Sequence, residues 1–151
     1  MNGQGSEGAS VKMKCLSVRQ PWAHPIFFEA KDVENRTWTT KYRGPLLIHA
    51  SQKIDRDVMQ RLTSDPHFKN LEASCPTSAI IGVVELTDVV TDSRSEWAVE
   101  GKYHLLLSKP RLFAEPIPRS GWLGLFDVDI PEAVLKKARK PLARRRGYEE
   151  R

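Results

Sequence analysis

The sequence predicts a mixed α+β domain built on a curled, mainly antiparallel sheet. About six short segments have the pattern of strands, only two or three have that of helices, and the two kinds do not alternate as in a βαβ fold. A Rossmann-type fold is disfavoured because no glycine-rich loop follows a strand. At 151 residues the chain has the length of one ordinary domain with a core of its own.

The first half of the chain contains clear strand patterns. Residues 14–19 alternate apolar and polar side chains, which is typical of a half-buried strand. Residues 34–38 predict a shorter strand, residues 42–45 a turn, and residues 46–50 a buried strand. Between the first two strands, Pro21 is expected in the first turn of a helix, where its missing N–H costs nothing. The apolar face of that helix would consist of Trp22, Ile26, Phe27 and Ala30.

The second half is expected to complete the sheet. Residues 55–62 predict a short amphipathic helix, and residues 65–77, which include two prolines, predict a loop. Residues 79–90 predict a long strand, apolar enough to lie near the centre of the sheet. Three further strands and a last helix are expected over residues 103–107, 112–118, 122–130 and 132–140.

Charge is distributed unevenly along the chain. The net charge is +5, but residues 136–151 hold eight of the 24 basic and two of the 19 acidic residues, which leaves −1 for the rest. We therefore expect a disordered segment over residues 1–12, one domain over residues 13–135 and a basic tail over residues 136–151. A near-neutral domain needs a local cleft to bind nucleic acid. The tail could add phosphate affinity, target the nucleus or be a solvated end.

The composition argues against several classes of protein. The longest apolar run, residues 79–84, is far short of the ~20 residues that a membrane span needs. The N-terminus lacks the pattern of a signal peptide, so we expect no membrane partner and a cytoplasmic location, with the nucleus as the alternative for a eukaryotic source. Cys15 and Cys75 are isolated and are interpreted as reduced structural thiols. The four histidines lack metal-ligand spacing, so neither a metal nor another cofactor is expected.

The most informative segment spans residues 31–38. If it is extended, Glu34, Arg36 and Trp38 share one face of the strand, with Lys31 just upstream. A carboxylate, a guanidinium and an indole on one face can bond to a base edge, pair with a phosphate and stack on a ring. The same set could instead include a lysine that acts as a base, or form a surface ion-pair ladder without function. The residues alone leave these alternatives open.

Several segments between residues 14 and 130 occur in an order typical of one family. They are LSVRQPWA at residues 16–23, Lys31, Glu34 and Arg36 with the spacing KxxExR, YRGPLLIHAS at residues 42–51, IGVVEL at residues 81–86, PIPR at residues 116–119 and GLF at residues 124–126. This set resembles the ASCH domain (activating signal cointegrator homology), a branch of the PUA-like β-barrels associated with RNA. The KxxExR spacing is similar to the family signature, GxKxxExR.

One departure from the family concerns the turn before the signature lysine. The signature has a glycine shortly before its lysine, where this chain has Ala30. If the backbone there needs a positive φ, alanine costs on the order of 1 kcal/mol.

The resemblance implies a PUA-like, mainly antiparallel β-barrel with flanking helices and a cleft lined by the signature. The favoured function is binding of nucleic acid, RNA in the first place and single-stranded DNA otherwise, or of a modified nucleoside. The residues expected to bind it are Lys31, Glu34, Arg36, Trp38, Arg19, Gln20, Trp22 and Arg43.

An enzyme is the alternative that the resemblance leaves open. Single-domain relatives deacylate N-acetylated cytidine with a lysine, a threonine three positions later and a glutamate on the central strand. In this chain Lys31 matches the lysine, Glu34 stands at the threonine position, and Glu85 is the candidate for the central glutamate. A carboxylate cannot replace a hydroxyl by the same mechanism. A ribonuclease with Lys31 and Glu34 as its acid–base pair is a further alternative.

Overall fold

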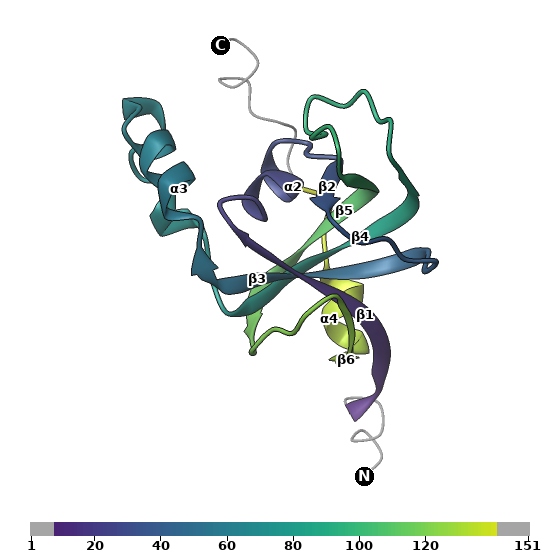
Figure 1. Cartoon of the computed structure of the whole chain (residues 1–151). Helices are drawn as coiled ribbons and strands as arrows, with labels where there is room; N and C mark the ends of the chain where they lie inside the picture. The colour runs from purple at the N-terminus through teal and green to yellow at the C-terminus, as the bar shows by residue number, and fades with distance from the viewer. Residues whose placement is uncertain (1–7, 142–151) are drawn as a thin grey trace.

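A computed structural model of the chain describes residues 8–141, which form one six-stranded sheet with short flanking helices (Figure 1). The strand order is β2-β5-β4-β3-β1-β6, and each neighbouring pair is antiparallel except β1 and β3. The strands are β1 Ser10–Gln20, β2 Val33–Arg36, β3 Gly44–Ile54, β4 Ala79–Val90, β5 Tyr103–Pro118 and β6 Leu125–Pro131. The α-helices are α2 His24–Phe28, α3 Arg56–Thr63 and α4 Glu132–Lys137, and two 3₁₀ turns cover Pro66–Phe68 and Glu72–Ser74.

The predicted class, α+β with a mainly antiparallel sheet, is confirmed, but the sheet is not closed into a barrel. Within residues 8–141 no ladder joins the edge strands β2 and β6. With only four residues, β2 offers little backbone for a second ladder. The sheet still curls far enough that Arg36 of β2 donates to the backbone oxygen of Ser17 on β1, at 2.8 Å. A side chain therefore spans the gap that a barrel would close with strand pairing.

Apolar clusters cover both faces of the sheet. On one face, Ile26 and Phe27 of α2 belong to a cluster that includes Leu16. On the other, Leu135 of α4 packs against a cluster that includes Cys15. Neighbouring residues of β1 thus point to opposite cores, as the two-residue period of a strand requires. Burial raises the pKa of the Cys15 thiol to about 12, in keeping with a structural role for this cysteine.

The first helix begins later and is shorter than predicted. Pro21 lies in the turn before it, α2 begins only at His24, and Pro25 occupies the first turn. The helix ends at Phe28 because Ala30, just beyond it, has a φ of 58°. This is the left-handed region in which a side chain is unfavourable, so the condition stated for Ala30 is met.

Other elements differ from the prediction in their extent. The two strands expected over residues 103–107 and 112–118 are one strand, β5, because Lys109 and Pro110 form a bulge that shifts the register without ending the pairing with β4. The last strand begins at Leu125 instead of residue 122, and α4 ends at Lys137. The long strand over residues 79–90 is confirmed as β4.

The described chain extends past both predicted domain ends. β1 begins at Ser10, which pairs with Pro131 of β6, so residues 10–12 are ordered strand. Beyond α4, Arg139 forms a bridge with Leu112 of β5. Residues 1–7 and 142–151, which contain most of the predicted disordered segment and of the basic tail, lie outside the described residues. In the described part, no helix has the length and apolar character to cross a membrane.

Candidate functional site

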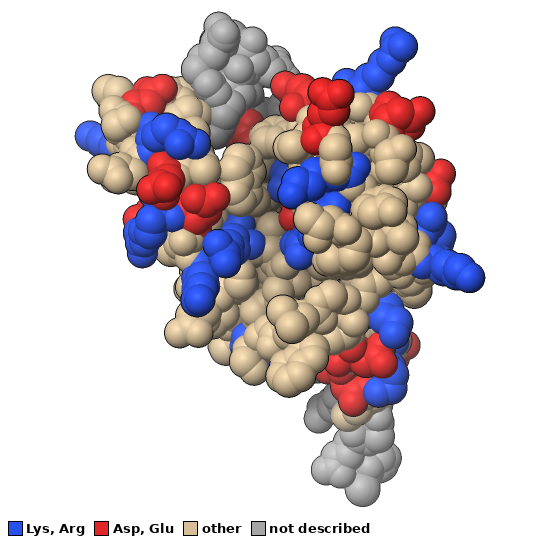
Figure 2. Space-filling model, in the orientation of Figure 1, with Lys and Arg blue, Asp and Glu red and all other residues tan. Residues whose placement is uncertain are grey.

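A pocket of about 1370 Å³ hollows one face of the molecule (Figure 2). Its lining comes from parts of the chain that are far apart in sequence: β1, β2 with the residues after it, the end of β3, and residues 121–124 before β6. Basic side chains gather around the hollow in Figure 2. The charged residues of the lining are Arg19, Arg36, Lys53 and Lys102, against Glu34 and Asp55. The pocket therefore has a local excess of positive charge.

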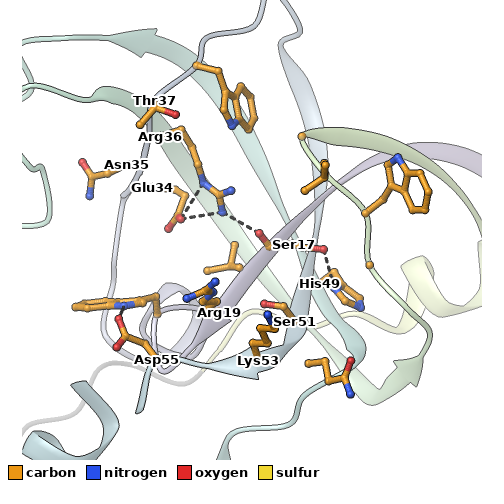
Figure 3. Close-up of a pocket in the computed structure, with 18 of the residues that line it drawn as sticks. Ser17, Arg19, Glu34, Asn35, Arg36, Thr37, His49, Ser51, Lys53 and Asp55 are labelled. Carbon is orange, nitrogen blue, oxygen red and sulfur yellow. Dashed lines mark hydrogen bonds and ion pairs between the residues drawn. The ribbon is translucent and has the colours of Figure 1, made fainter. Parts of the chain in front are cut away.

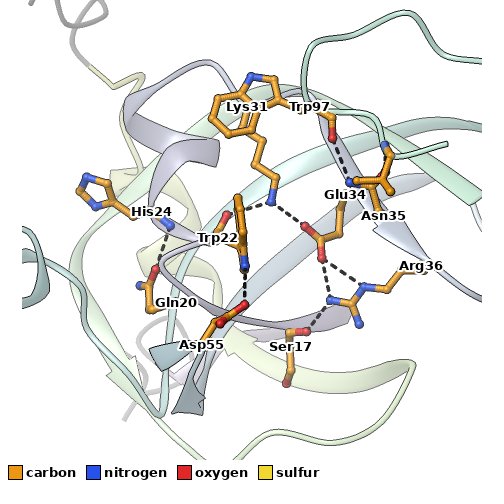
Figure 4. A network of polar contacts seen from close by, with 11 residues as sticks. Ser17, Gln20, Trp22, His24, Lys31, Glu34, Asn35, Arg36, Asp55 and Trp97 are labelled. Atoms are coloured by element: carbon orange, nitrogen blue, oxygen red, sulfur yellow. Dashed lines mark hydrogen bonds and ion pairs between the residues drawn. The ribbon is translucent and has the colours of Figure 1, made fainter. Parts of the chain in front are cut away.

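Lys31, Glu34 and Arg36 form one connected network, here called the ion triad (Figure 4). The Lys31 ammonium donates to Glu34 Oε1 at 2.7 Å and to the backbone oxygen of Trp22 at 3.0 Å. On its other side, Glu34 Oε2 accepts from Arg36 Nε at 3.2 Å and from Nη2 at 3.0 Å. Both carboxylate oxygens are thus paired with a cation, and the alternation of β2 places Glu34 and Arg36 on one face.

Burial separates the ion triad from a surface ion-pair ladder. The side chains of Lys31 and Glu34 are 3% and 10% exposed, and that of Arg36 is 22% exposed. Removing one partner of such a buried pair leaves an uncompensated charge, which is strongly destabilising. Glu34 and Arg36 line the pocket, whereas Lys31 lies behind them and is absent from the lining. Lys31 therefore supports the site from within.

Two indole rings flank the ion triad at the pocket. Lys31 Nζ lies 5.4 Å from the centre of the Trp22 ring, and the Arg36 guanidinium carbon lies 5.9 Å from that of Trp38. The Trp22 Nε1–H donates to Asp55 Oδ2 at 3.2 Å, which holds this ring at the pocket edge. Both tryptophans line the pocket, and Trp22 is 36% exposed. Each ring thus offers surface on which a planar group can stack.

Arg19 and Lys53, here called the rim cations, differ from the ion triad in their surroundings. Both side chains are exposed and line the pocket. Neither forms a side-chain hydrogen bond or an ion pair with another residue of the described chain. Figure 3 shows both at the pocket, one from β1 and one from β3. Their charge is available to an anionic ligand.

Three residues predicted for the site lie outside the pocket lining. Gln20 is buried and joins α2 to the loop before β4, because its amide donates to Pro76 O and accepts from the His24 N–H. Arg43 is paired with Asp88 at 3.1 Å. Glu85 lies within β4, where Pro45 and Ser108 are its ladder neighbours.

A serine and a histidine that the sequence did not mark as a pair meet in the pocket (Figure 3). Ser17 Oγ lies 2.9 Å from His49 Nδ1, and His49 Nε2 lies 2.7 Å from the backbone oxygen of Arg119. A carbonyl only accepts, so Nε2 holds the proton and Nδ1 accepts from the Ser17 hydroxyl. Burial lowers the pKa of His49, which favours this neutral form. His49 is a satisfied buried group, as interpreted from the sequence.

Gly121 is needed for space, whereas the sequence suggested that it supplies backbone freedom. A Cβ at this position would lie within 2.3 Å of Ser17 Oγ and 2.7 Å of His49 Cε1. Ser17, Lys53 and the segment containing Gly121 were all missed by sequence reasoning, because only the curl of the sheet brings them beside β2. Their positions along the chain contain no common motif.

The geometry gives the hydrolase alternatives little access to a substrate. Lys31 and Glu34 are buried against one another, and Glu85 lies away from the pocket lining. In this arrangement the lysine and the carboxylate hold each other. Among residues 8–141, no cluster of histidine, cysteine, aspartate and glutamate is arranged to hold a metal ion.

Comparisons with known proteins cover the strands that build this site. Residues 16–128 match the family model described as ASCH domain. A segment of 89 residues is 34% identical to Activating signal cointegrator 1 of Homo sapiens and 33% identical to the protein of that name in Mus musculus. The match covers 53% of this chain and 15% of each relative, so the chain spans only a small part of the curated relatives it matches.

Proposed function

The chain belongs to the ASCH domain family, and on that basis we propose that its pocket binds one nucleotide of a single-stranded nucleic acid, with RNA as the favoured ligand. The family is associated with RNA, which agrees with the chemistry of the lining. The observation that supports the proposal most directly is the pair of rim cations beside two indole rings in one pocket. Phosphate pairs with exposed cations, and a base stacks on an aromatic ring.

Arg36 is the residue that contacts both the interior and the ligand in this proposal. Its Nε and Nη2 are bonded to Glu34 and to the Ser17 carbonyl, while Nη1 bonds to no other residue of the described chain. Because Arg36 lines the pocket, its remaining N–H groups are available for a base edge or a phosphate oxygen. The ion triad fixes the direction of this guanidinium before the ligand arrives, which lowers the ordering cost of binding.

The test compares two double variants with the same loss of charge. Arg19→Ala/Lys53→Ala removes the rim cations, and Lys12→Ala/Lys14→Ala removes two lysines of β1 that pair with Asp129 and Asp127 outside the pocket lining. Affinity for a labelled oligouridine is measured by fluorescence anisotropy at several salt concentrations. We expect the rim variant to bind more weakly and to lose roughly 1.4 from the slope of log K against log salt, about 0.7 for each phosphate contact.

The control variant should keep a slope close to that of the wild type, because its lysines are assigned no phosphate contact. Equal slopes for the rim variant and the wild type would contradict the proposal. So would an equal loss in the two variants, because it would indicate a non-specific response to net charge.

A further inference from the structure

The segment before β6 exposes two large apolar side chains beside the pocket. Trp122 is 74% exposed and Leu123 is 86% exposed, more than any other large hydrophobic residue of the described chain. Both line the pocket. Single exposed apolar residues are common, but an adjacent pair at the edge of a pocket is typical of an interaction site. We call these two residues the apolar tip.

The base of this segment is fixed against two strands of the sheet. The Arg119 carbonyl is bonded to His49 of β3. Gly121 approaches β1 and β3 so closely that a Cβ would meet Ser17 and His49. After the tip, Gly124 has a φ of 62°, which turns the chain into β6. The two side chains are thus held at the pocket by an anchored backbone, so little additional ordering is needed when a ligand binds.

From this geometry we infer that Trp122 stacks on the base next to the one in the pocket, with Leu123 beside it. The inference rests on the proposed function and deepens it, because it defines the ligand as a strand with at least two adjacent unpaired nucleotides. A free nucleotide would occupy the pocket without using the apolar tip. A base stacked on an indole gains affinity whatever its sequence, since every base has a π-face.

The charges around the tip favour a nucleic-acid strand over an apolar protein partner. The pocket beside it has four basic and two acidic lining residues, and both acids are already engaged: Glu34 in the ion triad and Asp55 with Trp22. A strand presents phosphates at regular spacing along with its bases, so one ligand satisfies both the rim cations and the tip. An apolar protein surface would leave those cations desolvated and unpaired.

The experiment measures two ligands against three variants. A short oligouridine and uridine monophosphate are titrated into the wild type and into Trp122→Ala, Trp122→Phe and Val99→Ala. Val99 is the matched control, because its side chain is 50% exposed and does not line the pocket. We expect Trp122→Ala to weaken oligouridine binding roughly 5- to 150-fold, the effect of losing one base stack. Its affinity for uridine monophosphate should match that of the wild type.

The remaining variants decide whether stacking is the cause. Trp122→Phe should recover most of the oligouridine affinity, since phenylalanine retains a ring, and Val99→Ala should bind as the wild type does. Unchanged oligouridine affinity in Trp122→Ala would overturn the inference and leave the proposed function standing. An equal loss for both ligands would also overturn it, because Trp122 would then belong to the first nucleotide's site. A wild type that binds neither ligand would overturn the proposed function itself.

Discussion

The ion triad and the rim cations place the same kinds of charge at one pocket in opposite environments. Lys31 and Arg36 share the carboxylate of Glu34 and are largely withdrawn from water. Arg19 and Lys53 are exposed and have no charged partner in the described chain. Buried, paired charges affect chiefly the stability of the fold, whereas exposed, unpaired charges affect chiefly association. The signature residues and the ligand-binding residues of this pocket are therefore only partly the same.

The largest expected effect comes from breaking the ion triad at Lys31. Lys31→Ala leaves Glu34 buried with only Arg36 as a partner, and we expect the free energy of unfolding to fall by about 3–5 kcal/mol. Urea denaturation followed by circular dichroism measures this change. Lys53→Ala is the control and should stay within about 0.5 kcal/mol of the wild type, because its side chain is exposed. Similar stabilities for the two variants would contradict the division drawn above.

Arg36 is expected to show an intermediate effect on both quantities. Arg36→Lys keeps the charge but cannot reproduce the fork that reaches Glu34 and the Ser17 carbonyl together. We expect a loss of roughly 1.5–3 kcal/mol in stability, the contribution of hydrogen bonds to charged groups, together with weaker oligouridine binding. Thermal melting and anisotropy on the same preparation separate the two losses. A variant with wild-type stability and affinity would show that the fork matters to neither.

The smallest expected effect is a stabilisation at Ala30. Its φ of 58° suits glycine, so Ala30→Gly should raise the free energy of unfolding by about 1 kcal/mol. This turn places Lys31 within the ion triad, because the Lys31 N–H donates to Pro25 O at 3.0 Å. Oligouridine affinity should not change, since the turn lies outside the pocket lining. A destabilised variant would contradict the strain assigned to alanine here.

Much of the fold could be predicted from the sequence because strand burial leaves a strong pattern. Residues 79–90 form a continuous apolar run and are the strand β4 with those limits. The bulge at Lys109 could not be foreseen, because a proline inside a strand pattern usually ends it and only the register with β4 shows that pairing continues. The open sheet was missed for a related reason: closure depends on the pairing of β2 with a distant strand, which local pattern does not encode.

The candidate site divides in the same way. Lys31, Glu34 and Arg36 were selected from their spacing, and the structure joins them because neighbouring residues of one strand and one turn remain close. Arg19, Trp22 and Trp38 also line the pocket, whereas Gln20, Arg43 and Glu85 do not. The apolar tip and Lys53 reach the pocket only through the curl of the sheet. Sequence distance therefore limited what could be predicted.

The four tryptophan indoles provide the most direct test of the central claim, that ligand binds in this pocket. Trp22, Trp38 and Trp122 line it, and Trp97 does not. In a ¹H–¹⁵N correlation spectrum, titration with oligouridine should shift the indole N–H signals of the three pocket tryptophans and leave that of Trp97 in place. A shift confined to Trp97, or no indole shift at saturating ligand, would contradict the account.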